Sequence, residues 1–550
     1  MRSETHHLVP AAGRQWLRAA VPVPVCAANP ATGTAMSSRA DTAAAVTGDS
    51  IAVAGWTALS RATGVLRFAV IGAVLGPTFF GNTYQFTNSL PNLVFYGLLG
   101  GALFSSLLVP ALVKSIDLGD RAGSVRLAGG FLGVAWLGLA VLVPVTVLAG
   151  PLALGAGQQG QARVLLALFV PQLFCYAVVA TSVAVMNAHR RFALAAGAPA
   201  IENLGIIAVL LAIGDPSRIV PLGIGTTLAV VLHAAVQWAG ARRAGVTLVP
   251  RAGWRDPEAR TLIRRAVPSV IQAALAAGQL VVLLAIANRV PGGVVAFQLA
   301  LSFCYVINAL GAVPFALAAL PRLARMHRDG DRAGFAGTLA GGLSLGLFVT
   351  VPVAVIYFVM AGPLAGLVSA GRMGPGGTAL IAAALAGLAA AVIGETIFSI
   401  STYASYARED TRSPLWSTVV GAGTCLTVAS LALPAEGTAV LAILGLAYSA
   451  GAVAAAIVLS TRIWRDRAPA RRKLLTSAGR TAAGAVVLAG PAWLTSVTVP
   501  DLVGAPLGTG AGLLAAVCVA AGLFLAVQVL LRAPELALVA GGFKSLRGRS

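Results

Sequence analysis

Long apolar runs alternate with short polar connectors along almost the whole chain. Each run, bounded by charge, proline or glycine, has about 20 to 30 residues, and about 20 apolar residues suffice for a helix to cross a bilayer. The predicted spans are 51–75, 82–113, 125–150, 163–188, 192–213, 219–241, 262–288, 292–321, 333–361, 378–406, 413–433, 437–461, 475–497 and 507–531. The pattern therefore predicts an all-α polytopic membrane protein with about 14 transmembrane helices.

The basic residues support this count of spans, because Lys and Arg collect on the cytoplasmic side of membrane proteins. With the N-terminus inside, the predicted inside segments carry 33 of the 39 Lys and Arg residues, the outside segments four, and the first span two. We therefore expect both termini in the cytoplasm. This topology accounts for the formal net charge of +21, and no basic, aromatic-rich domain suggests nucleic acid as a partner.

Composition narrows the class of protein further. A chain that is 58% hydrophobic and 10% charged is neither soluble and globular nor disordered. Residues 1–48 are rich in Ala, Thr, Ser, Pro and Arg, and we expect a disordered cytoplasmic tail, with Met1 or Met36 as the start. The five cysteines have no metal-ligand spacing, so neither a disulfide framework nor a metal site is predicted.

A weak internal repeat divides the chain into lobes. Short basic connectors at 187–199 and 406–414 each lead to a proline early in the next span, and they lie six spans apart. Such spacing favours two six-helix lobes related by a pseudo-two-fold axis. We place the N-lobe at 49–243 (spans 1–6), the C-lobe at 244–465 (spans 7–12), and two extra helices with a basic cytoplasmic tail at 466–550.

Two arginines lie inside the first apolar span. A charge near the centre of a membrane costs at least about 2.5 kcal/mol, so Arg61 and Arg67 are expected to face a wet cavity. Six residues along a helix separate them by about 9 Å and roughly 120°. The two arginines are thus candidates to bind one anionic group from two sides, or to bind two separate anionic groups. The alternative is that the side chain of Arg67 extends to the membrane interface.

The second span carries a neutral polar stripe. Gln85, Asn88 and Asn92 recur at helical spacing and offer hydrogen bonds to sugar or amide groups, unless they only join helices. Nearby, Pro91 removes a backbone donor in mid-span.

Glycines follow the proline at Gly100 and Gly101. With Pro91 they predict a bent or hinged helix, and broken helices beside a cavity are typical of transporters.

The second lobe has polar positions of its own. Gln298, Ser302 and Tyr305 lie at helical spacing on the eighth span, and Gln279 lies on the seventh. We predict that they share one cavity with the first two spans, although helix packing explains any single one of them equally well.

Two acids lie within predicted spans. Glu395 is in mid-span, and because a buried carboxylate must be paired, protonated or bound to a cation, it is a candidate coupling site for Na⁺ or H⁺. Glu202 on the fifth span is the corresponding acid of the first lobe, and it is a weaker candidate for ion coupling. His233 is expected to be a packed histidine.

No sequence motif indicates catalysis. A Walker A loop, a nucleophile elbow and a zinc-ligand motif are all missing from the chain. We expect no enzyme activity and no cofactor, with energy supplied by a Na⁺ or H⁺ gradient or by the membrane potential.

The phrases at 60–68 (SRATGVLRF) and 88–110 (NSLPNLVFYGLLGGALFSSLLVP), with both connectors, resemble the MurJ (MviN) lipid II flippase family of the MOP exporter superfamily. High Ala, Gly, Arg and Val usage is typical of a high-GC bacterium such as an actinomycete. The resemblance covers roughly residues 51–465. It implies alternating access that translocates lipid II, the undecaprenyl-pyrophosphate precursor of peptidoglycan, through a cavity formed by spans 1, 2, 7 and 8. It also implies cell-wall synthesis proteins as partners.

The chain departs from this family where many members carry charges. An acid often follows the second arginine, at Phe68 here, and another begins the second span, at Asn82. The family's arginines after the Pro-Asn-Leu phrase are matched by Phe95 and Tyr96, and its charged pair on span 8 by Leu301, Ser302 and Tyr305. Three alternatives therefore stay open: a Wzx-like flippase for another lipid-linked glycan, a MATE-like exporter, and a non-transporting scaffold.

Overall fold

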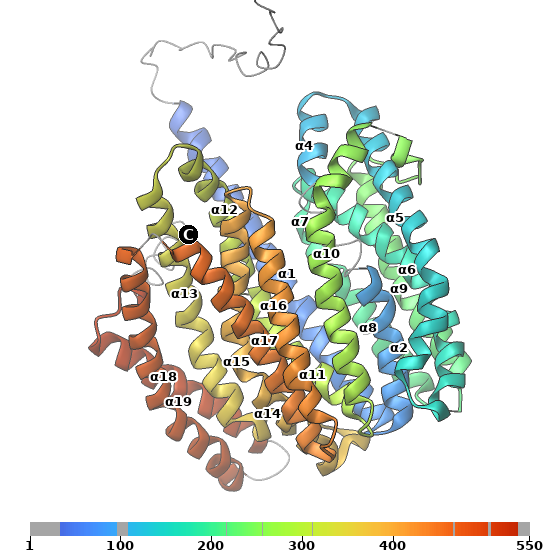
Figure 1. Ribbon diagram of the computed structural model, residues 1–550, viewed down its shortest axis with the longest axis vertical. Helices are drawn as coiled ribbons and strands as arrows, with labels where there is room; N and C mark the ends of the chain where they lie inside the picture. Colours follow the sequence, from blue (N-terminus) through green and yellow to red (C-terminus); the bar gives the residue numbers. More distant parts are fainter. Residues whose placement is uncertain are drawn as a thin grey trace, which may run out of the picture. The chain divides into compact units, whose positions relative to one another are not determined.

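The computed structural model describes residues 34–95, 108–215, 217–255, 257–310, 312–465, 468–503 and 508–536. Within these ranges all regular structure is helical, with no strand (Figure 1). The chain divides into a unit of residues 1–48 and a unit of residues 49–550, and all that follows concerns the second. The all-α fold predicted from the sequence is confirmed.

Twelve helices in the described part of the chain are long and apolar enough to cross a membrane, and they match twelve of the fourteen predicted spans. Within the spans predicted at 82–113 and 292–321 the structure describes α2 (Phe79–Phe95) and α11 (Gly293–Leu310), and each is followed by residues outside the described ranges. These two occupy corresponding positions in the two lobes, six spans apart.

The first lobe consists of helices before residue 244. They are α1 (Thr34–Leu75), α2, α4 (Val109–Asp117), α5 (Arg121–Ala149), α6 (Gln159–Ala188), α7 (Phe192–Gly197), α8 (Pro199–Ile213) and α9 (Ile219–Arg243), with 3₁₀ turns at Gly150–Ala153 and Ala156–Gln158. Helix α1 begins at Thr34, within the predicted N-terminal tail, and residues 1–33 lie outside the described ranges, so the disordered tail at 1–48 stays a prediction.

The second lobe and the C-terminal helices follow. They are α10 (Pro257–Ala287), α11, α12 (Ala312–Arg328), α13 (Arg332–Val359), α14 (Ala361–Val368), α15 (Gly374–Tyr406), α16 (Arg412–Ala429), α17 (Gly437–Trp464), α18 (Ala468–Val503) and α19 (Gly508–Leu530), with 3₁₀ turns at Gly253–Arg255, Gly371–Met373 and Ser430–Ala432.

Helix pairings in one lobe recur in the other. In the first, α6 packs against α2, α5 and α9, and α8 packs against α9. In the second, α15 packs against α11, α13 and α17, and α16 packs against α17. Each helix therefore meets the same neighbours as its counterpart six spans away, as two related lobes require.

Close helix packing in the second lobe depends on glycine. A Cβ at Gly387 on α15 would lie 2.5 Å from the carbonyl oxygen of Ala442, and a Cβ at Gly445 on α17 would lie 2.6 Å from that of Ala384. Small residues permit such approach between membrane helices, where packing rather than the hydrophobic effect holds helices together. The α15–α17 pair is thereby fixed as the centre of this lobe.

The two C-terminal helices pack against each other and α18 packs against α13 (Figure 1). Phe348 on α13 meets Phe524 on α19 with ring centroids 5.1 Å apart. Leu488 and Ala492 of α18 are fully buried in the same apolar cluster. This pair therefore packs against the second lobe.

The predicted hinge is described only in part. Helix α2 continues through Pro91 as far as Phe95, so the proline lies inside a regular helix. Gly100 and Gly101 lie outside the described residues. The hinge remains a prediction.

Candidate functional site

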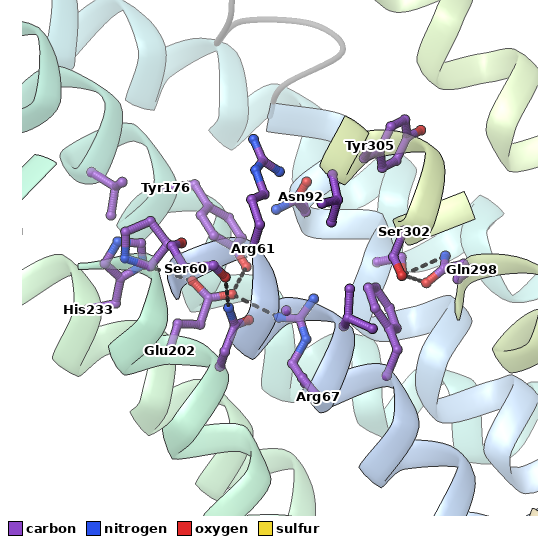
Figure 2. Close-up of a pocket in the computed structure, with 18 of the residues that line it drawn as sticks. Ser60, Arg61, Arg67, Asn92, Tyr176, Glu202, His233, Gln298, Ser302 and Tyr305 are labelled. Carbon is purple, nitrogen blue, oxygen red and sulfur yellow. Dashed lines mark hydrogen bonds and ion pairs between the residues drawn. The ribbon is translucent and has the colours of Figure 1, made fainter. Parts of the chain in front are cut away.

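A cavity of about 680 Å³ lies between the two lobes (Figure 2). Its walls come from α1, α2, α6, α7, α8 and α9 of the first lobe and from α10 and α11 of the second. The predicted site residues that line it are Arg61, Arg67, Asn88, Asn92, Glu202, Gln298, Ser302 and Tyr305. Most of the site predicted from the sequence is therefore gathered at one place.

A buried charged group occupies the first-lobe side of this cavity. Arg67 Nη1 of α1 lies 3.4 Å from Glu202 Oε1 of α8, with side-chain exposures of 17% and 9%. Tyr176 Oη donates to the same oxygen at 3.1 Å, and His233 Nδ1 lies 2.8 Å from Oε2. Side chains from three helices, α1, α6 and α9, thus surround one carboxylate on α8 (Figure 2).

This group bears on three interpretations of the sequence, and for Arg67 it agrees with the expected place in the cavity. Arg67 is paired inside the protein and does not reach for the membrane interface. His233 contacts a carboxylate and is more than a packed histidine. The acid beside Arg67 is supplied by Glu202, although the adjacent position in the chain is Phe68, so the cavity is more charged than the local sequence suggested.

Sequence reasoning could identify this group only weakly. Glu202, His233 and Tyr176 are far apart in the chain, and only the packing of α8 and α6 against α9 brings them together. An acid, a histidine and an arginine in three different apolar spans were the available clue, because each is costly in a membrane without a partner.

Arg61 is arranged differently. It is exposed in the cavity, and it forms no hydrogen bond or ion pair with any residue that the structure describes. Figure 2 shows its side chain extending away from Arg67 and Glu202. Arg61 is therefore a cation available to an anionic ligand.

The amide side chains of α2 have two different roles. Asn88 and Asn92 line the cavity, as predicted. Gln85 does not: it is buried and donates to Gln298 Oε1 of α11, to which Ser89 Oγ also donates at 3.0 Å. Gln85 therefore joins the two lobes, and its predicted role in binding substrate is not supported.

A second contact between the lobes lies toward the start of α2. Asn82 Nδ2 donates to the carbonyl of Val290 at 2.8 Å, and the backbone N–H of Val294 donates to Asn82 Oδ1 at 3.0 Å. Asn288 and Gln158 exchange side-chain hydrogen bonds of 2.9 and 3.1 Å beside it. These contacts close the two lobes together at the end that the charge pattern places outside the cell.

Two predicted residues belong to a different cavity of about 370 Å³ within the second lobe. Gln279 and Glu395 line it, together with Tyr448 and with Tyr305, which also lines the central cavity. Tyr448 Oη donates to Glu395 Oε1 at 3.0 Å. Gln279 is therefore not part of the central cavity, and Glu395 is separated from Arg61 and Arg67.

The sequence matches the family described as lipid II flippase MurJ over residues 71–504. A probable lipid II flippase MurJ of Rhizobium meliloti is 26% identical over 494 residues, covering 84% of this chain and 90% of the relative. The lipid II flippase MurJ of Burkholderia cenocepacia is 27% identical over 384 residues, covering 66% and 74%.

Solved structures show the same fold. A lipid II flippase MurJ in an inward closed conformation superposes with a TM-score of 0.69 at 16% identity, covering 88% of this chain and 99% of the other. An inward-facing multidrug transporter of the MATE family gives a TM-score of 0.54 at 13% identity, covering 76% and 95%.

Proposed function

The chain belongs to the MurJ family of lipid II flippases, and we propose that it carries lipid II across the bacterial cytoplasmic membrane by alternating access. The chain crosses the membrane many times, as the twelve long apolar helices require. The charge pattern supports an orientation with both termini in the cytoplasm. Its substrate is an undecaprenyl-linked lipid that moves within the bilayer.

The observation that carries this proposal is a free arginine in a polar cavity between two lobes. A pyrophosphate group needs cationic donors, and arginine binds phosphate oxygens through a planar fork of N–H groups. Arg61 is exposed in the cavity, and Arg67 lies about 1.7 turns further along the same helix. Asn88 and Asn92 add amide groups suited to the sugars and peptide of the precursor.

Energy coupling is assigned to the second-lobe cavity. Glu395 lies in a membrane-spanning helix, and the hydrogen-bond partner that the structure gives it is the neutral Tyr448. A carboxylate in such a position is a natural binding site for Na⁺ or H⁺. Tyr305 borders both cavities, so occupation of Glu395 and of the central cavity is expected to be coupled through α11.

Replacement of the resident lipid II flippase in a bacterium tests the proposal. We expect this chain to restore growth after depletion of the resident protein, and Arg61→Ala to abolish the rescue at equal membrane abundance. Glu436→Ala is the matched control, because Glu436 is exposed in the connector between α16 and α17.

Failure of the well-inserted wild type to support growth would contradict lipid II as the substrate. Rescue by Arg61→Ala and Glu395→Ala alike would instead support a scaffold without transport. A Wzx-like flippase would restore export of a different lipid-linked glycan, and a MATE-like exporter would confer drug efflux.

A further inference from the structure

We infer that Glu202 is an internal counter-ion that holds Arg67 while the cavity is empty and yields it to the pyrophosphate of the substrate. The inference rests on the proposed function and assigns a specificity-determining role to Glu202, which touches Arg67 at the wall of the cavity.

The Arg67–Glu202 pair is poised for exchange. The contact is 3.4 Å long, whereas strong arginine–carboxylate hydrogen bonds are about 2.7–2.9 Å. Only Nη1 makes it, and the buried Nε of Arg67 has no acceptor among the described residues. Arg67 therefore has donors that an incoming phosphate would satisfy better than Glu202 does.

Glu202 keeps other hydrogen-bond donors when Arg67 moves away from it. Removing one member of a buried ion pair is strongly destabilising when it leaves a bare charge behind. Here Tyr176 and His233 continue to donate to the carboxylate, at 3.1 and 2.8 Å. Gln237 Nε2 lies 3.5 Å from His233 Nε2, an arrangement that leaves the ring hydrogen on Nδ1, facing Glu202.

The two arginines then act in order. Arg61 has no partner among the described residues and meets an incoming anion first. Arg67 follows only if the ligand offers a second phosphate with enough affinity to displace Glu202. A lipid with one phosphate would engage Arg61 alone, so the exchange favours lipids with two adjacent phosphates.

Arginine-selective labelling of the purified full-length protein tests this exchange directly. Phenylglyoxal modifies accessible guanidinium groups, and peptide mass spectrometry follows each site separately. We expect Glu202→Gln to speed modification of Arg67 at least about fivefold, the lower end of typical coupling effects. Modification of Arg61 should be unchanged.

Matched variants guard against a general loss of structure. Glu535→Gln alters another buried carboxylate, which pairs with Ser477, and should leave the labelling of Arg67 unchanged. Glu202→Asp keeps the charge but withdraws it by one methylene, and it should also accelerate labelling of Arg67 if Glu202→Gln does not fold.

Lipid binding gives the second readout. Lipid II should protect Arg67 in the wild type, whereas undecaprenyl monophosphate should protect Arg61 only. Glu202→Gln should bind lipid II at least about fivefold more tightly, and this gain should disappear in an Arg67→Gln background, because Glu202 acts through Arg67.

The outcomes separate the two claims. Unchanged labelling of Arg67 in both Glu202 variants would overturn the counter-ion role, whatever the protein transports. Faster labelling without protection by lipid II would support the counter-ion role and contradict lipid II as its ligand.

Discussion

Asn82→Ala is expected to open the predicted outer end of the protein. Asn82 joins the first lobe to the backbone of the second through two short hydrogen bonds, to the carbonyl of Val290 at 2.8 Å and from the N–H of Val294 at 3.0 Å, and a longer one to the carbonyl of Asn288 at 3.5 Å. It is fully buried at the start of α2, about 9 Å before the cavity residue Asn88. Alanine removes these bonds, and opening of the lobes would hydrate the backbone groups that it leaves.

The size of the effect follows from the two short bonds. Each contributes about 1 kcal/mol net, so the closed arrangement should lose about 2 kcal/mol relative to the open one. Because 1.4 kcal/mol is a factor of ten in an equilibrium constant, the open population should rise about 30-fold.

Labelling of a cavity cysteine measures this population. A Ser302→Cys substitution in a cysteine-free protein places a thiol in the cavity on α11, and a membrane-impermeant maleimide applied to right-side-out vesicles reaches it only through the outer end. Asn82→Ala should speed this labelling by about the factor calculated above, in proportion to the open population.

Thr87→Ala is the matched control. Thr87 is buried on the same helix, but among the described residues it bonds only to the carbonyls of Thr83 and Tyr84 within α2, so its loss should leave labelling unchanged. Equal labelling rates in wild type and Asn82→Ala, with both proteins folded, would refute the assignment of Asn82 as a contact that closes the lobes.

Three further outcomes are expected. Glu395→Gln should reduce lipid II translocation about tenfold and remove its dependence on Na⁺ or pH, whereas unchanged ion dependence would exclude Glu395 as the coupling site. Arg61→Lys keeps the charge but not the planar fork, and should bind lipid II more weakly than wild type by about tenfold in a direct binding assay. Gly387→Ala should destabilise the protein by about 1–3 kcal/mol in a thermal unfolding assay, because its Cβ would lie 2.5 Å from Ala442 O, whereas Gly376→Ala, with open space around it, should not.

Much of the fold was predictable because a membrane limits what the chain can do. Apolar length alone located twelve of the fourteen predicted spans where the structure has long helices. The spans predicted at 82–113 and 292–321 include residues outside the described ranges, next to α2 and α11, so their full lengths stay predictions.

Part of the site was predictable because a charged side chain inside a membrane has a high free-energy cost and must therefore face a polar environment. Arg61, Arg67 and Glu202 were each singled out by that cost, and all line one cavity. Pairing was not predictable, because Glu202 is 135 residues from Arg67 and the two meet only through the packing of α8 beside α1. The amides illustrate the same limit: Asn88 faces the cavity, whereas Gln85, three residues earlier, contacts the opposite lobe.

Appearance of lipid II on the outer leaflet is the most direct test of the central claim. Cells whose resident flippase is acutely inactivated would be treated with an externally added enzyme that cleaves exposed lipid II, and the cleaved fraction would be measured. We predict that this chain restores cleavage to the level of the resident flippase and that Arg61→Ala does not. Persistent protection of lipid II from cleavage, with the wild-type chain abundant in the membrane, would contradict the account.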